Sequence, residues 1–234
     1  MTDRSSIKLI HNGRDQLDER IKAMLHDAFV SEQTLPQCPE IKLWLVDPAT
    51  MQRPFSLDEI RSIWEHTAYW AFCWASGQVL GRYILDNPNL VKGKKILDFG
   101  TGSGVVAIAA MMAGAKDVVA CDIDTDALIS TLANAQLNQV ELTLNDDLFS
   151  IEVRDFDLLI AADVLYDREN LSFLDTFFDF APEVLLADSR IKNFSHPQYD
   201  PIDQIASFTV PDLDELDEFR QVNLYRGKMA KVAD

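Results

Sequence analysis

The stretch from Ile96 to Gly104, ILDFGTGSG, has the residue types and spacing best suited to holding a ligand. An apolar run ends in Asp98, and Gly100, Gly102 and Gly104 follow at every second position. Glycines between a strand and a helix let the backbone approach a nucleotide-like ligand closely. The spacing differs from the G-x-G-x-x-G of dinucleotide sites, and Asp98 would repel a pyrophosphate. S-adenosylmethionine, which carries an ammonium and a sulfonium, therefore fits this loop better than NAD.

Two acidic segments follow the glycine loop where further apolar runs end. Asp122, in the sequence CDID, lies about 20 residues after the loop, a separation at which an acid can bind both ribose hydroxyls. Asp124 suits the N-terminal cap of the next helix. Asp146, in the sequence NDD, is placed to reach the adenine amino group, and a solvated turn is the alternative. For Asp98 we expect attraction of the ligand's ammonium, with capping of the turn as the alternative.

The sequence ADVLYD brings an acid and then an aromatic residue to the end of a fourth apolar run. Methyl transfer is an in-line displacement, so an enzyme mainly aligns the acceptor and excludes water. Asp163 is suited to hold an amine acceptor by a charge-assisted hydrogen bond, and the face of Tyr166 to line the path of the methyl group. Trp74, in an aromatic segment upstream, is suited to shield the sulfonium. The structural alternatives are a carboxylate that ends a strand, a tyrosine packed beneath a helix and a tryptophan in the core.

The elements that must position these residues alternate along the chain. Short apolar runs separated by helical segments are typical of buried parallel strands in a doubly wound α/β sheet. We expect a Rossmann-like, seven-stranded methyltransferase sheet with an antiparallel last strand, and an N-terminal extension or cap over residues 1–50 before a domain of 51–234. The extension either caps the ligand mouth or adds an edge to the sheet. The expected strands are 96–99, 117–121, 141–144, 156–162, 183–187, 204–210 and 220–225, and the expected helices are 17–30, 67–85, 104–113, 125–138 and 170–180, with a further strand at 41–46.

Composition limits the classes of partner. The chain has 38 acidic and 21 basic residues and a net charge of −17, which argues against nucleic acid because phosphate binding needs Lys and Arg. The charge permits a basic partner. Three cysteines and four histidines form no metal-ligand spacing, so we expect no metal. The first sixteen residues contain no continuous apolar stretch, which predicts no secretory signal, no membrane contact and a cytoplasmic location.

Taken together, residues 64–226 resemble the seven-strand lysine methyltransferases that include the enzyme modifying the beta subunit of electron transfer flavoprotein. The resemblance rests on WASGQ followed by GRYILDNP, on DFGTGSG, on CDID and on ADVLYD, which matches the family's D-x-x-Y signature. The segment LADSR is similar to the family's D-P-G-R but has Ser189 in place of proline. The resemblance implies S-adenosylmethionine-dependent methylation of a protein lysine, and an acidic enzyme suits a lysine-rich surface.

Other functions remain open from the sequence. One is methylation of a small, nicotinamide-like amine, in which residues 1–50 would close the pocket as a lid. Another is a non-catalytic protein that binds S-adenosylmethionine, although such a protein would not need Asp98, the three glycines and Asp122 together. A dehydrogenase is disfavoured by the glycine spacing. Methylation of DNA or RNA is disfavoured by the charge and by the lack of an [N/D]-P-P-[Y/F] motif after the fourth strand.

Overall fold

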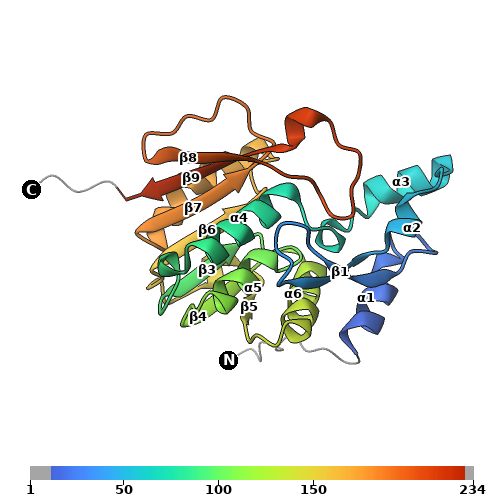
Figure 1. Ribbon diagram of the computed structural model, residues 1–234, viewed down its shortest axis with the longest axis horizontal. Coiled ribbons are helices and arrows are strands. Elements are labelled where there is room, and N and C mark those ends of the chain that lie inside the picture. The colour runs from blue at the N-terminus through green and yellow to red at the C-terminus, as the bar shows by residue number, and fades with distance from the viewer. Residues whose placement is uncertain (1–11, 230–234) are drawn as a thin grey trace, which may run out of the picture.

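The computed structural model of this chain describes residues 12–229. Its strands include β3 (Lys95–Phe99), β4 (Asp117–Cys121), β5 (Thr143–Asn145), β6 (Leu158–Ala162), β7 (Glu183–Asp188), β8 (Tyr199–Ala206) and β9 (Gln221–Lys228). They form one sheet in the order β5-β4-β3-β6-β7-β9-β8 (Figure 1). Neighbours from β5 to β7 pair in parallel, and β9 is antiparallel to both β7 and β8. The predicted doubly wound sheet with an antiparallel last strand is confirmed.

Helices cover both faces of this sheet because its central strands are apolar on both sides. The helices α5 (Val105–Met112) and α6 (Thr125–Leu137) follow the predicted positions closely. The helix α4 (Ala75–Asp86) begins eight residues later than the helix expected over 67–85, after the 3₁₀ turn Tyr69–Ala71. Ile96 and Ile160 belong to the core that includes α4 and α5, whereas Leu97 and Leu159 belong to the core on the other face. All four side chains are fully buried. The sheet therefore holds the ends of β3 and β6 rigidly.

The helix predicted over 170–180 is interrupted. The structure has only α7 (Phe173–Thr176), flanked by the 3₁₀ turns Arg168–Ser172 and Phe177–Asp179. The Ser172 hydroxyl donates to the Glu169 carbonyl at 2.8 Å and the Thr176 hydroxyl donates to the Ser172 carbonyl at 3.3 Å. Such bonds from Ser and Thr to nearby backbone compete with the helical ladder. They are consistent with a segment that stays helical for only one turn.

The segment before the sheet forms its own small unit, visible beside α6 in Figure 1. It contains α1 (Gly13–Ile21), β1 (Val30–Thr34), β2 (Lys42–Val46), α2 (Pro48–Met51) and α3 (Leu57–Glu65). The strands β1 and β2 pair only with each other, so this unit is not an added edge of the main sheet. The helix expected over 17–30 ends at Ile21 because Val30 already belongs to β1. The unit is fixed to α6, whose Asn134 accepts the Trp44 amide at 2.7 Å.

No helix within residues 12–229 is long and apolar enough to span a membrane. The prediction that the N-terminus lacks a secretory signal falls mainly on residues 1–11, which lie outside the described residues. All three cysteines are free and buried.

Candidate active site

The sheet order brings together acids that are far apart in the sequence. The strands β4, β3 and β6 are neighbours in the sheet and parallel. Asp98 is the last residue but one of β3, while Asp122 and Asp163 directly follow β4 and β6. The carboxyl ends of adjacent parallel strands meet at one edge, which is where ligands bind in sheets of this kind. Three of the predicted site residues therefore share one edge of the sheet.

The glycine loop has the backbone geometry that its composition predicts. The φ angles of Gly100, Gly102 and Gly104 are +70°, +52° and +82°, a region that disfavours other side chains. A Cβ added at Gly100 would lie 2.7 Å from Val164. At Gly102 the nearest atom to such a Cβ is the Gly100 carbonyl oxygen, 4.0 Å away, so this position is open. The loop forms a backbone cradle that is closed beneath and open at Gly102.

Asp98 is almost completely buried. Only 2% of the residue is exposed, and its Oδ2 has no hydrogen-bond partner within residues 12–229. Burial raises the pKa of this carboxyl to about 7, partly opposed by a hydrogen bond with Thr101. A buried carboxylate oxygen without a partner is costly. A cationic group of a ligand could donate the hydrogen bond that this oxygen lacks.

We expect the affinity for S-adenosylhomocysteine to rise with pH up to about pH 7. An ammonium group favours the ionised carboxylate, so below the pKa of Asp98, about 7, binding must release a proton. The affinity should then change by up to about tenfold per pH unit and level off above pH 7. Titration calorimetry between pH 5.5 and 8, in two buffers of different ionisation enthalpy, measures the affinity and the proton release.

The isosteric variant Asp98→Asn is the control for this pH dependence. Burial also raises the pKa of Asp122 and that of Asp188, to about 6 for Asp188, so other acids titrate in the same range. The variant should bind S-adenosylhomocysteine more weakly. It should also lose the part of the pH dependence of the affinity that comes from the titration of Asp98. An affinity slope that is the same in wild type and variant would contradict the assignment.

Asp122 connects the glycine loop to the helix that follows β4. Its Oδ2 accepts the Gly102 amide at 2.9 Å and its Oδ1 accepts the Asp124 amide at 3.0 Å. Each carboxylate oxygen can accept a second hydrogen bond, so a bidentate contact with ribose hydroxyls is compatible with these two. Asp124 accepts the Asp126 amide at 2.8 Å and caps α6, as predicted.

Asp146 lies after β5, at the far side of the same edge. Its side chain is exposed, and the described residues give it no hydrogen bond that would fix its direction. The neighbouring Asn145 accepts the Asp147 amide at 2.9 Å, and Asp147 caps the 3₁₀ turn Leu148–Ser150. The adenine contact of Asp146 therefore remains a prediction.

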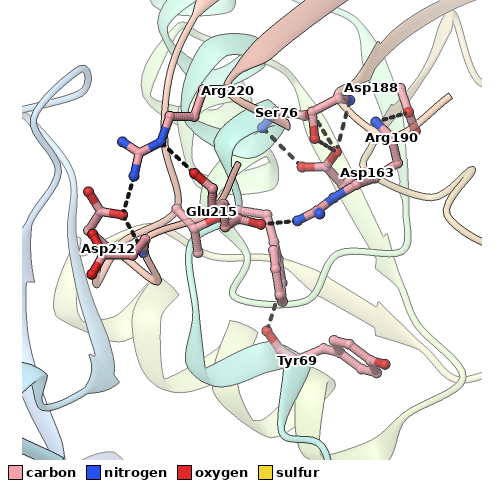
Figure 2. A network of polar contacts seen from close by, with 12 residues as sticks. Tyr69, Ser76, Asp163, Asp188, Arg190, Asp212, Glu215 and Arg220 are labelled. Atoms are coloured by element: carbon pink, nitrogen blue, oxygen red, sulfur yellow. Dashed lines mark hydrogen bonds and ion pairs between the residues drawn. The ribbon is translucent and has the colours of Figure 1, made fainter. Parts of the chain in front are cut away.

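The Asp163 carboxylate has an environment that the sequence did not predict. Its Oδ2 accepts the Ser76 amide at 3.0 Å, and its Oδ1 accepts the Ser76 hydroxyl at 2.6 Å (Figure 2). Its Oδ1 also accepts the Ser189 amide at 3.2 Å and the Ser189 hydroxyl at 2.9 Å. These four bonds tie the end of β6 to the first turn of α4 and the end of β7. Each of them joins Asp163 to the chain itself, whereas the sequence had predicted a bond to the acceptor.

Ser189 is a position at which this chain departs from the D-P-G-R segment that it resembles. In place of the proline of that segment, this chain has a serine that donates to Asp163 through both its amide and its hydroxyl. A proline has no amide hydrogen and no hydroxyl. The substitution therefore adds two hydrogen bonds to the clamp around Asp163, which we define as Asp163, Ser76 and Ser189.

Trp74 and Tyr166 lie on the outer side of this clamp. The Trp74 indole donates to the Tyr69 carbonyl at 3.0 Å, and the Tyr69 ring centroid lies 6.0 Å from that of Trp74 and 5.9 Å from that of Tyr166. Tyr166 is 62% exposed, so it does not pack beneath a helix. Partial burial raises its pKa, and the nearby Tyr69 and Asp122 add to the rise. Tyr166 is thus close to both the aromatic group and the acid at the end of β4.

Trp74 also lies beside an ion-pair network that the sequence did not predict. The Arg190 guanidinium lies 5.6 Å from the Trp74 ring centroid and 4.5 Å from that of Phe219, and it forms an ion pair with Glu215 (Figure 2). Glu215 also accepts the Thr209 hydroxyl at 2.5 Å. The acid and the arginine are 25 residues apart in the chain, so no local spacing signals their contact.

Known proteins are similar in sequence to most of the chain. The chain is 33% identical over 205 residues to the electron transfer flavoprotein beta subunit lysine methyltransferase of Rattus norvegicus, covering 84% of this chain and 79% of the relative. The enzyme of the same name from Homo sapiens is 35% identical over 187 residues, covering 76% of this chain and 70% of the relative. The chain therefore belongs to the electron transfer flavoprotein beta subunit lysine methyltransferase family.

Two further comparisons concern the methyltransferase segment and the fold. The family model for ribosomal protein L11 methyltransferase (PrmA) matches residues 80–167, from α4 to the end of ADVLYD. The structure of magnesium protoporphyrin IX methyltransferase from Synechocystis PCC 6803 superposes with a TM-score of 0.51 at 13% identity, covering 96% of this chain and 100% of that protein. The latter likeness shows the fold alone. The resemblance derived from the sequence, to a class I S-adenosylmethionine-dependent methyltransferase, is confirmed.

The edge of the sheet fits this family's cofactor. The unpartnered Oδ2 of Asp98 suits an ammonium, and the open backbone at Gly102 gives room for a ligand. A dinucleotide would place a pyrophosphate beside Asp98, where the two charges would repel each other. Within residues 12–229, one surface group has side chains that could ligate a metal, namely His26, Asp27 and Glu59. Its two carboxylates form ion pairs with the Arg53 guanidinium.

Proposed function

We propose that this chain is an S-adenosylmethionine-dependent N-methyltransferase that modifies a lysine of another protein. The observation that carries the proposal is the identity of 33% across 84% of the chain with a relative named for lysine methylation of the electron transfer flavoprotein beta subunit. Tyr166, which follows β6, and the neighbouring Tyr69 are both exposed, which leaves the site accessible to a side chain of a large acceptor. The net charge of −17 favours encounter with a basic surface.

The residues of the chain have distinct roles in this proposal. Asp98, the amides of the glycine loop and Asp122 bind and orient the cofactor, which supplies a methyl group on a positively charged sulfur. Trp74 and Tyr166 exclude water beside that sulfur. The acceptor lysine attacks as a neutral amine, the C–N bond forms as the C–S bond breaks, and the proton of the amine passes to solvent. Catalysis is then mainly alignment and desolvation.

For Asp163 we replace direct contact with the acceptor by positioning. Its four hydrogen bonds hold Ser76 and Ser189. Trp74 lies two residues before Ser76, and Arg190 directly follows Ser189. A carboxylate fixed in this way sets the places of the residues around the acceptor.

The experiment that tests the function is transfer of a labelled methyl group from S-adenosylmethionine to purified electron transfer flavoprotein beta subunit. Label is expected on lysine, located by peptide mass spectrometry. The same acceptor with its lysines acetylated should take up no label, because an amide nitrogen is not nucleophilic. Nicotinamide, run in parallel, tests the small-amine alternative, and label on nicotinamide alone would overturn the proposal.

The cytoplasmic location remains part of the proposal. Three free, buried cysteines suit a reducing compartment. Fractionation of cells that express the full chain tests this location.

A further inference from the structure

Tyr69 is the one residue of its segment that faces outward. It begins the 3₁₀ turn Tyr69–Ala71, in which Trp70 and Ala71 are buried, and the following Phe72 is also buried. Tyr69 itself is 50% exposed. Figure 2 shows its ring pointing away from the ion pairs of Arg190 and Arg220. Half of this large aromatic side chain is therefore accessible to another molecule.

The backbone of Tyr69 is nevertheless held firmly. Its carbonyl accepts the Trp74 indole at 3.0 Å and the Phe72 amide at 3.3 Å. Its ring lies between those of Trp74 and Tyr166, at 6.0 and 5.9 Å between centroids. The turn therefore presents one ring face at a fixed place beside two residues of the candidate site.

The charges around these rings favour a cationic side chain. The Arg190 guanidinium near Trp74 is neutralised by Glu215, so it does not oppose a second cation there. Asp122 is near enough to Tyr166 to contribute to the rise in the pKa of that tyrosine. Aromatic faces attract ammonium groups, and they also pack well against the methylene stem of a lysine.

We infer that Tyr69, with Trp74 and Tyr166, forms an aromatic rim that receives the side chain of the acceptor lysine, and that Tyr69 determines acceptor affinity. This inference rests on the proposed function and adds a residue that no sequence motif marks. Tyr69 acts through its ring face, because within the described chain its hydroxyl has no hydrogen-bond partner. The rim positions the amine and does not take part in bond breaking.

The test compares Tyr69→Ala with Tyr69→Phe, using electron transfer flavoprotein beta subunit as the acceptor. Tyr69→Ala is expected to raise the KM for the acceptor by about three- to fivefold, the upper part of the scale of a cation–π contact at an exposed site. It should change kcat little and leave the affinity for S-adenosylhomocysteine within twofold. Tyr69→Phe should keep the wild-type KM. Trp64→Ala is the matched control, since Trp64 is an 81% exposed aromatic on α3.

Each other outcome overturns the inference. An unchanged KM for Tyr69→Ala would remove Tyr69 from the acceptor site. An equal loss in Tyr69→Phe would show that the hydroxyl, and not the ring face, is needed. A parallel fall in cofactor affinity would make Tyr69 a support of the cofactor pocket. If wild type itself transfers no methyl group to this acceptor, the proposed function fails, and the inference fails with it.

Discussion

Asp163→Ala is expected to lower methyl transfer by about 10²-fold or more, the cost of misplacing reacting groups by about an ångström. The carboxylate joins the first turn of α4 to the end of β7 through four hydrogen bonds. Trp74 lies two residues before Ser76, and Arg190 directly follows Ser189. Without the carboxylate, both side chains lose their fixed positions. The affinity for S-adenosylhomocysteine should stay within about threefold, because the clamp does not contact the glycine loop. Single-turnover transfer and calorimetry measure the two quantities.

The double variant Ser76→Ala with Ser189→Ala separates positioning from direct contact with the acceptor. It keeps the Asp163 carboxylate but removes the two hydroxyl bonds of 2.6 and 2.9 Å. If Asp163 acts by positioning, this variant should lose a large part of the activity as well. Full activity in the double variant would return Asp163 to the role predicted from the sequence, that of holding the acceptor amine. Thermal unfolding checks that both variants fold.

Asp122→Ala is expected to weaken binding of S-adenosylhomocysteine by about 1.5–3 kcal/mol, or roughly 10- to 150-fold, the scale for losing charged hydrogen bonds. The carboxylate is partly buried at the edge of the sheet and holds the Gly102 amide. Loss of the side chain removes both the proposed ribose contact and one support of the glycine loop. Calorimetric titration measures the change in affinity.

Asp124→Ala is the matched control for this prediction. Asp124 lies two residues further on and caps α6 through a bond of 2.8 Å to the Asp126 amide, so the variant tests the cost of disturbing the helix start alone. It should keep most of the affinity. Unchanged binding in Asp122→Ala would remove Asp122 from the ribose role. An equal loss in both variants would assign the effect to the helix start.

The sequence predicted the strand, the glycine loop and the following helix well because these features depend on local sequence, whereas the cofactor contacts of the residues there remain predictions. Gly100, Gly102 and Gly104 indicated a close backbone approach between a strand and a helix, and their φ angles lie in the left-handed region that favours glycine. The acids that end apolar runs necessarily meet at one edge of a parallel sheet, which placed Asp98, Asp122 and Asp163 together. The boundaries of the antiparallel pair were less accurate, since β8 starts at Tyr199 in a segment without a strong alternating pattern.

The acceptor side could not be predicted from the sequence, because its contacts join distant segments. The bonds of Asp163 to Ser76 and Ser189 span 87 and 26 residues, and the Arg190–Glu215 pair spans 25. A carboxylate at the end of a strand looks the same in sequence whether it binds an acceptor or the chain itself. Only its hydrogen-bond partners distinguish the two roles.

By itself the sequence determined the doubly wound sheet, the glycine cradle and the charge that suits a basic partner, since each follows from periodicity, backbone freedom or composition. The tertiary structure alone decided that residues 13–51 pack against α6, that Asp163 is clamped and that Tyr69 faces outward beside Tyr166. The physical reason is that burial and hydrogen bonding depend on which distant groups the fold brings within a few ångströms.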